Sequence, residues 1–206
     1  MDGTRFLRAL MLVSIALAMA AATYSQPPNL LLNRNADEGG ERWRFFFEGA
    51  SVEHGPGRNP HFALRNGLSI IQIVRLPQGS AGKYAVLIGR ASSDKADNAT
   101  RKGLPVLFAD TRAEFEPGQY TVTSTPVDHQ WMPPRSARPE EWVTVTGRFQ
   151  IREGTVAIKF GIGISGDPER KPATRPAARF DDLGLYLFGT EEEADLFVRM
   201  YNDGLR

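Results

Sequence analysis

The stretch TVAIKFGIGI, Thr155–Ile164, decides the fold class, because side chains of two kinds alternate along its whole length. Successive side chains of a β-strand point to opposite faces. One face then carries only branched or aromatic residues: Val156, Ile158, Phe160, Ile162 and Ile164. The other carries Thr155, Ala157, Lys159, Gly161 and Gly163. We expect the first face to lie in a core and the second to leave room for a ligand or another layer.

Shorter runs of the same kind occur on both sides of this strand and are separated by Gly, Pro and Asn. The expected strands are Leu30–Asn33, Trp43–Phe47, Leu68–Leu76, Lys83–Ala91, Pro105–Phe108, Gln119–Ser124, Trp142–Ile151 and Phe180–Phe188. Short strands broken by turn residues are typical of an all-β sandwich or barrel. The sequence therefore predicts two packed antiparallel sheets. Expected loops are 92–103, 126–140 and 165–178.

The end of the chain predicts a short α-helix, Glu191–Asn202. Thr190 followed by Glu193 is a capping-box pattern, and Gly204 supplies a stop. Leu196, Phe197, Met200 and Tyr201 form one apolar stripe. We expect residues 190–206 to pack on the sandwich. The alternative is a docking helix for a protein partner.

The beginning of the chain has the layout of a secretory signal. Arg5 and Arg8 precede an apolar run, 9–22, and a polar stretch with two prolines follows. The run has about 14 residues, whereas a membrane-spanning helix needs about 20. We expect a signal peptide over residues 1–25, a sandwich over 26–189, and a secreted or periplasmic protein without a stable membrane span. An uncleaved N-terminal anchor is the alternative.

Composition excludes several classes of protein. The chain has no cysteine, which excludes disulfides and thiolate metal sites. It has 25 basic and 24 acidic residues, and without Asp2, Arg5 and Arg8 there are 23 of each. A balanced chain lacks the basic footprint expected for binding nucleic acid or anionic lipid.

Two segments near the ends of the predicted sandwich carry a resemblance to a known family. Asn29–Trp43 and Phe180–Phe188 each couple an apolar stretch to carboxylates, and Ile71–Leu76 and Trp142–Phe149 lie between them. Together they resemble the bacterial carbohydrate-binding modules of the galactose-binding-like jelly-roll fold. The resemblance covers nearly all of residues 29–188 and implies carbohydrate or cell-envelope glycan as the ligand.

The resemblance also implies a structural calcium ion, which takes six to eight oxygen ligands. Its carboxylates would come from Asp37 and Asp181, although these modules often have Glu at the position of Asp37. If Leu183 and Leu185 face the core, Asp181 points the same way and needs neutralising. The alternative for Asp181 is hydrogen bonding to loop amides or an ion pair with Arg179.

Sugar recognition needs an aromatic surface for the C–H face of a pyranose and polar groups for its hydroxyls. Trp131 is the expected aromatic group, because it lies in a predicted loop, with Gln130 and Arg135 supplying hydrogen bonds. The alternative is that Trp131 closes one end of the core. Trp43 and Trp142 are expected to be core residues.

No catalytic motif accompanies these residues. His54, His61 and His129 lack the spacing of a zinc site, and the sequence has no Gly-x-Ser-x-Gly motif. We therefore predict a non-catalytic binding module. The alternatives are a structural or protein-interaction domain of the envelope and a jelly-roll enzyme that degrades polysaccharide. The enzyme needs His, Arg, Tyr or carboxylate side chains converging on one sheet.

The loop arginines of 135–138 and 170–179 are either solvated or a site for acidic polysaccharide.

Overall fold

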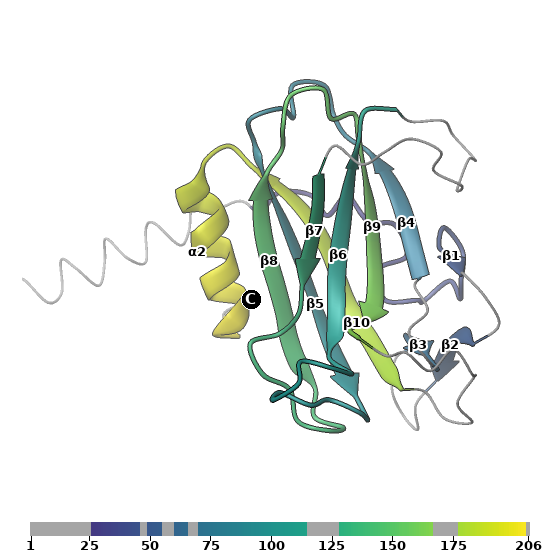
Figure 1. Ribbon diagram of the computed structural model, residues 1–206. Helices are drawn as coiled ribbons and strands as arrows, with labels where there is room; N and C mark the ends of the chain where they lie inside the picture. Colours follow the sequence, from purple (N-terminus) through teal and green to yellow (C-terminus); the bar gives the residue numbers. More distant parts are fainter. Residues whose placement is uncertain are drawn as a thin grey trace, which may run out of the picture.

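The computed structural model describes residues 26–45, 49–54, 60–65, 70–114, 128–166 and 177–204. Within them, two five-stranded antiparallel sheets lie face to face and one helix covers the outside of the second sheet (Figure 1). The predicted signal peptide and the predicted strand Gln119–Ser124 lie outside the described residues. None of the helices in the described part of the chain is long and apolar enough to cross a membrane.

We call the sheets A and B. Sheet A has the order β1-β4-β9-β6-β7, with β1 Arg44–Phe45, β4 Ile70–Arg75, β9 Ala157–Ile164, β6 Pro105–Arg112 and β7 Asp128–Met132. Sheet B has the order β2-β3-β10-β5-β8, with β2 Ala50–His54, β3 Pro60–Leu64, β10 Ala178–Phe188, β5 Tyr84–Ser93 and β8 Val143–Gln150. The predicted jelly-roll sandwich is confirmed.

The core lies between the two sheets and follows the alternation seen in the sequence. Ile158, Phe160 and Ile162 of β9 are fully buried in it, as expected. Trp43 is also buried there, with its ring centroid 4.8 Å from that of Phe62 and 6.0 Å from that of Phe160. Each such side chain contributes roughly 1.5–3 kcal/mol through burial.

The predicted strand Leu30–Asn33 is wrong: its Leu30 amide donates to the Leu185 carbonyl of β10 at 2.9 Å, but no sheet ladder forms and side chains hold the rest of the segment. The side-chain NH₂ of Asn33 donates to the backbone carbonyls of Gly39 and Glu41. Its side-chain oxygen accepts from the backbone amide of Glu38. The Gln72 side chain pairs with both backbone groups of Leu32. The segment therefore leads from β10 of sheet B to β4 of sheet A and ends in a tight turn.

Three strands were not predicted: β2, β3 and β7. Their sequences, ASVEH, PHFAL and DHQWM, are short and mix polar and apolar residues. Strands this short carry almost no periodic signal, so their pairing partners decide their conformation.

Helix α2 spans Glu191–Asn202, as predicted, and the capping box between Thr190 and Glu193 is present. It packs on the outer face of sheet B, where Phe197 lies 4.8 Å from the Tyr186 ring and 5.1 Å from the Phe188 ring. Only part of the predicted stripe is buried, since Leu196 stays 41% exposed. Ala194, Phe197 and Tyr201 are the buried residues of the helix.

Candidate functional site

Two stacked aromatic side chains stand on the outer face of sheet A. Trp131 on β7 is in register with Phe108 on β6. Their ring centroids are 5.8 Å apart and their planes 21° apart. Trp131 is 46% exposed and Phe108 is buried. The buried ring therefore fixes the exposed one in place, and we call this pair the aromatic platform.

The platform depends on a glycine in the next strand. Gly161 of β9 is in register with Phe108, and the tip of the Phe108 ring lies where a side chain of residue 161 would be. A Cβ built on Gly161 would come within 2.1 Å of that ring, whereas one built on Gly163 would meet nothing closer than 3.6 Å. Gly161 lets Phe108 lie flat across the sheet.

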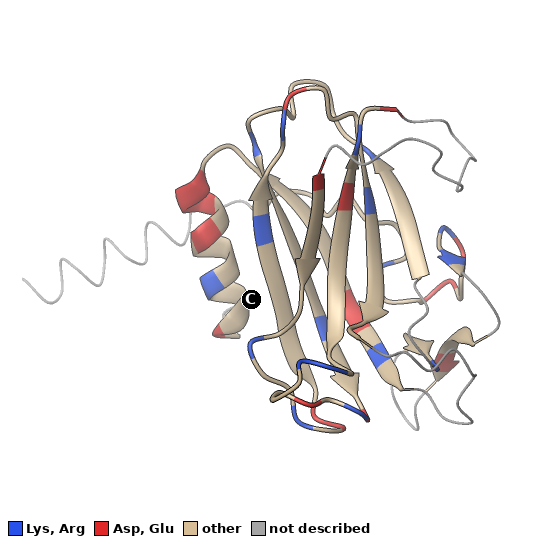
Figure 2. Cartoon of the chain, viewed as in Figure 1, with Lys and Arg blue, Asp and Glu red and all other residues tan. Residues whose placement is uncertain are grey.

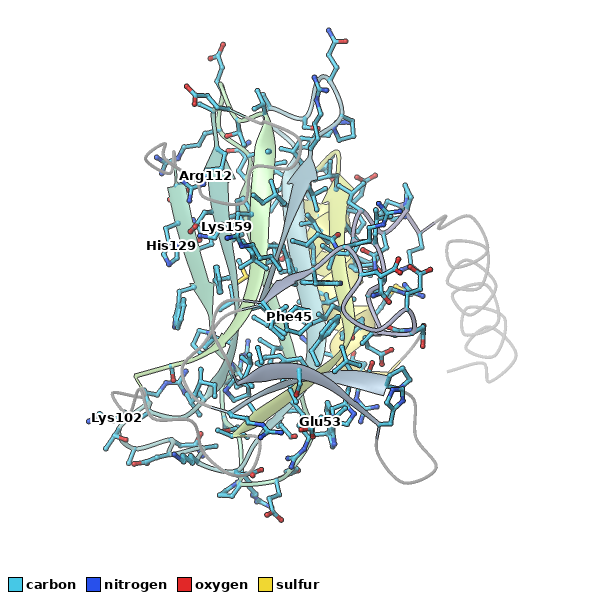
Figure 3. All side chains as sticks on the ribbon, turned by 90° about the vertical axis from the view of Figure 1, so that its right-hand side faces the viewer. Phe45, Glu53, Lys102, Arg112, His129 and Lys159 are labelled. Carbon is cyan, nitrogen blue, oxygen red and sulfur yellow. The ribbon has the colours of Figure 1, made fainter. Side chains whose placement is uncertain are left out.

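A polar cluster lies one row further along the same face, and we call it the Asp110 cluster. Asp110 accepts from Lys159 Nζ at 2.6 Å and from an Arg112 guanidinium nitrogen at 3.1 Å, and it also pairs with His129 Nδ1. Figure 3 shows Arg112, Lys159 and His129 close together on neighbouring strands. Burial alone would raise the pKa of Asp110, but the bonds from Lys159 and His129 outweigh it and hold the pKa below its usual value.

The predicted sugar-binding residues separate in the structure. Trp131 lies in the edge strand β7 and not in a loop, because it pairs with β6. Gln130 precedes it in the strand and therefore points to the opposite face, where its side chain donates to Asp128 at 3.0 Å. Arg135 follows the strand and is exposed, and its carbonyl accepts from Arg101 at 3.0 Å. Only Trp131 belongs to the platform.

The prediction that Asp181 faces the core is wrong, because β10 carries a bulge between Asp181 and Gly184. Phe180 and Leu183 both face the core, so Asp181 points out of sheet B. There it accepts from the Asp182 amide at 2.8 Å. Burial raises its pKa, and the charges of His61 and Arg90 partly oppose the rise.

The predicted calcium ligand Asp37 is exposed, in the turn after Asn33. Across the described residues no group of three or more His, Cys, Asp or Glu side chains is placed to hold a metal ion. Asp37 and Asp181 by themselves do not make up the six to eight oxygen ligands that calcium needs. Calcium binding stays a prediction.

The two framework tryptophans differ. Trp43 is in the core, as expected, but Trp142 is half-buried outside it. Val143 packs against the core, so Trp142 beside it turns to the outer face of sheet B. Its ring lies 6.2 Å from that of His61, with the Arg90 guanidinium 5.7 Å above it.

Sequence reasoning missed most of the site. The pattern of β9 did place Lys159 and Gly161 on the open face. Phe108, Asp110 and His129 were not found, since they come from β6 and β7 and meet β9 only through pairing. The alternation Val106, Phe108, Asp110 and Arg112 was the available signal for β6, and reading it needed the strand to extend beyond Phe108.

Comparisons with known proteins bear on the fold. No protein-family model matches the sequence, and no curated protein is similar to it in sequence. Among solved structures, the enzymatically active domain of tailspike protein 4 of bacteriophage CBA120 has a TM-score of 0.54 at 8% identity over 78% of this chain. The N-terminal tandem of two family 22 carbohydrate-binding modules from Paenibacillus barcinonensis Xyn10C has a TM-score of 0.51 at 12% identity over 78% of the chain.

The matching region spans 21% of the tailspike protein and 50% of the tandem. A family 16 carbohydrate-binding module is similar over 99% of its own length and 76% of this chain, at 16% identity and a TM-score of 0.49. Identities this low show a shared architecture and leave the ligand open. The chain has the jelly-roll β-sandwich fold, and the solved structures similar to it include carbohydrate-binding modules.

Proposed function

We propose that the protein is an exported, non-catalytic module that binds carbohydrate, most simply a cell-envelope glycan, on the outer face of sheet A. The observation that carries the proposal is Trp131. It is a large aromatic side chain, 46% exposed, held on the outer face of sheet A by stacking on Phe108. Export rests on the sequence pattern of residues 1–25.

The chemistry of the face fits a sugar. An exposed indole offers a flat apolar surface to the C–H face of a pyranose, and binding then removes both surfaces from water. Lys159 and His129 lie in the next row and carry polar groups that sugar hydroxyls can bond. Since residues two apart along a strand are about 6.6 Å apart, one bound sugar can reach both rows.

The test is a glycan-binding screen followed by calorimetry on Trp131→Ala. We expect its affinity for the bound glycan to fall about tenfold or more, which corresponds to about 1.4 kcal/mol. Trp142→Ala is the matched control, because it removes the same side chain from the outer face of sheet B. Circular dichroism would confirm that both variants fold. Unchanged affinity in Trp131→Ala, or an equal loss in both variants, contradicts the proposal.

A second candidate function is cleavage of the bound glycan, and the Asp110 cluster favours it. His129 pairs through Nδ1 with a buried carboxylate, and its side chain is 51% exposed. A histidine oriented by a carboxylate can act as a general base. Release of new chain ends that disappears in His129→Gln, with binding retained, would favour the enzyme. Binding without release favours the module.

A further inference from the structure

We propose that the ligand of sheet A is an anionic glycan, one whose sugars carry carboxylate or sulfate groups. The inference rests on the proposed function and deepens it. It comes from the charges and hydrogen-bonding capacity of the face that carries the aromatic platform.

Among the described residues, the outward positions of sheet A hold more positive than negative charge. Lys159, Arg112 and Arg75 lie on β9, β6 and β4, and Arg44 lies on β1 in register with outward-facing Ile71. Asp110 is the carboxylate on the same face. Figure 2 shows the basic segment of β9 beside the acidic segment of β6. Arg44, Arg75 and Arg112 have further interactions of their own, so Lys159 is the cation of this face that carries the inference.

Asp110 is already satisfied by its neighbours. It is one carboxylate shared between two permanent cations, Lys159 and Arg112, with His129 on its other oxygen. Its side chain is only 7% exposed. Three neighbours occupy both of its oxygens, so Asp110 has little capacity left to accept bonds from sugar hydroxyls.

Lys159 is the cation best placed to meet a ligand. Its side chain is 21% exposed, three times as much as those of Asp110 and Arg112. Its ammonium lies 5.7 Å from the centroid of the Phe108 ring, between the Asp110 cluster and the platform. An ammonium has three N–H groups, and the bond to Asp110 uses one. A sugar stacked on Trp131 would therefore meet a positively charged hydrogen-bond donor, Lys159, at the edge of the platform. It would meet few hydrogen-bond acceptors there.

The test compares polygalacturonate and dextran sulfate with the neutral polymers galactan and dextran. We expect the protein to bind at least one anionic polymer at least tenfold more tightly than its neutral counterpart. Lys159→Met, which keeps the apolar stem, should lose about tenfold in that affinity and show a weaker dependence on salt. Lys159→Arg should retain most of the affinity. Lys102→Met is the control, because Figure 3 places this exposed lysine far from Lys159.

The outcomes separate the two proposals. Tight binding to polygalacturonate identifies carboxylate as the recognised group, binding to dextran sulfate identifies sulfate, and either supports the inference. Trp131-dependent binding that is equal for neutral polymers, or unaffected by Lys159→Met, overturns the inference and leaves the proposed function standing. Equal losses in Lys102→Met and Lys159→Met indicate nonspecific attraction and also overturn it. Binding to no polymer, or binding indifferent to Trp131, overturns the proposed function itself.

Discussion

The outer faces of the two sheets differ in how far they are covered, although the sheets have the same number of strands. On sheet B, Val86, Ile88, Tyr186 and Phe188 point outward and helix α2 covers them. On sheet A, the corresponding outward positions of β9 are Lys159, Gly161 and Gly163, and no described element covers the platform beside them. Helix α2 therefore buries part of the outer face of sheet B, whereas Trp131 on the outer face of sheet A stays exposed.

This difference is set by side chains and not by topology. Four large apolar residues on the outside of sheet B would be costly in water, and the amphipathic helix removes them from it. The outside of sheet A has buried apolar residues such as Ile71 and Val106, but around the platform it presents Lys159, His129 and the exposed Trp131. Changes on sheet B should thus alter stability without altering binding, whereas changes near the platform should alter binding.

The largest expected effect comes from Phe197→Ala on helix α2. Phe197 is buried between Tyr186 and Phe188, and truncating such a side chain leaves a cavity. We expect the free energy of unfolding to fall by about 3–5 kcal/mol, measured by urea denaturation. Leu196→Ala is the control, because Leu196 is 41% exposed on the same helix, and it should cost about 0.5 kcal/mol or less. Similar losses in the two variants would mean that the helix does not anchor through Phe197.

Next in size is Gly161→Ala on β9. The added methyl would overlap the Phe108 ring, so the ring must move. We expect a loss of about 1–3 kcal/mol in unfolding free energy, together with weaker glycan binding, because Phe108 supports Trp131. Gly163→Ala, two residues along the same strand, should be close to neutral in both assays, since its Cβ makes only ordinary contacts. Equal behaviour of the two alanines would contradict the account of the platform.

The sequence predicted well what depends on long periodic segments. The helix Glu191–Asn202 and the two faces of β9 were found, because each has a full period of its pattern repeated several times. The two packed sheets followed from the number of strands, and the jelly-roll fold followed from the family resemblance. Each of these features depends on residues that are close together in the sequence, or on a count of such segments.

The sequence could not predict what one irregular residue decides. The bulge of β10 places Asp182 at a φ of 51° and reverses the side to which Asp181 points, which simple alternation cannot anticipate. The same limit applies to β7, whose five residues become a strand only by pairing with β6. The candidate site lies across β9, β6 and β7, so most of it was hidden until the register was known.

A smaller effect is expected from Thr190→Ala at the start of helix α2. The Thr190 hydroxyl accepts from the Glu193 amide at 3.2 Å, and alanine leaves that amide without its capping bond. We expect a loss of about 1 kcal/mol in unfolding free energy. Thr190→Ser keeps the hydroxyl and should lose much less. Glycan binding should be unchanged in both, since the helix is on the other sheet from the platform.

The smallest expected effect is a dependence on pH with opposite sign on the two faces. The pKa of Asp110 is lowered by its cationic partners despite burial. Its ionised form therefore stabilises the fold above the unfolded pKa of about 3.9. This stabilisation is lost as pH falls through the folded pKa. Asp181 has a pKa raised by burial, so its ionised form costs stability at neutral pH, and acid relieves that cost.

The two asparagine variants separate these contributions. Relative to wild type, Asp110→Asn should be destabilised at about pH 7, and the deficit should shrink as pH falls toward about 3. Asp181→Asn should be the more stable protein at neutral pH, and its advantage should shrink over the same interval. The measurement is urea denaturation of each variant and of wild type at several pH values. If both variants differ from wild type in unfolding free energy with the same sign, the two carboxylates do not have opposite effects on stability. The contrast between an Asp110 stabilised by cations and an Asp181 penalised by burial would then have to be abandoned.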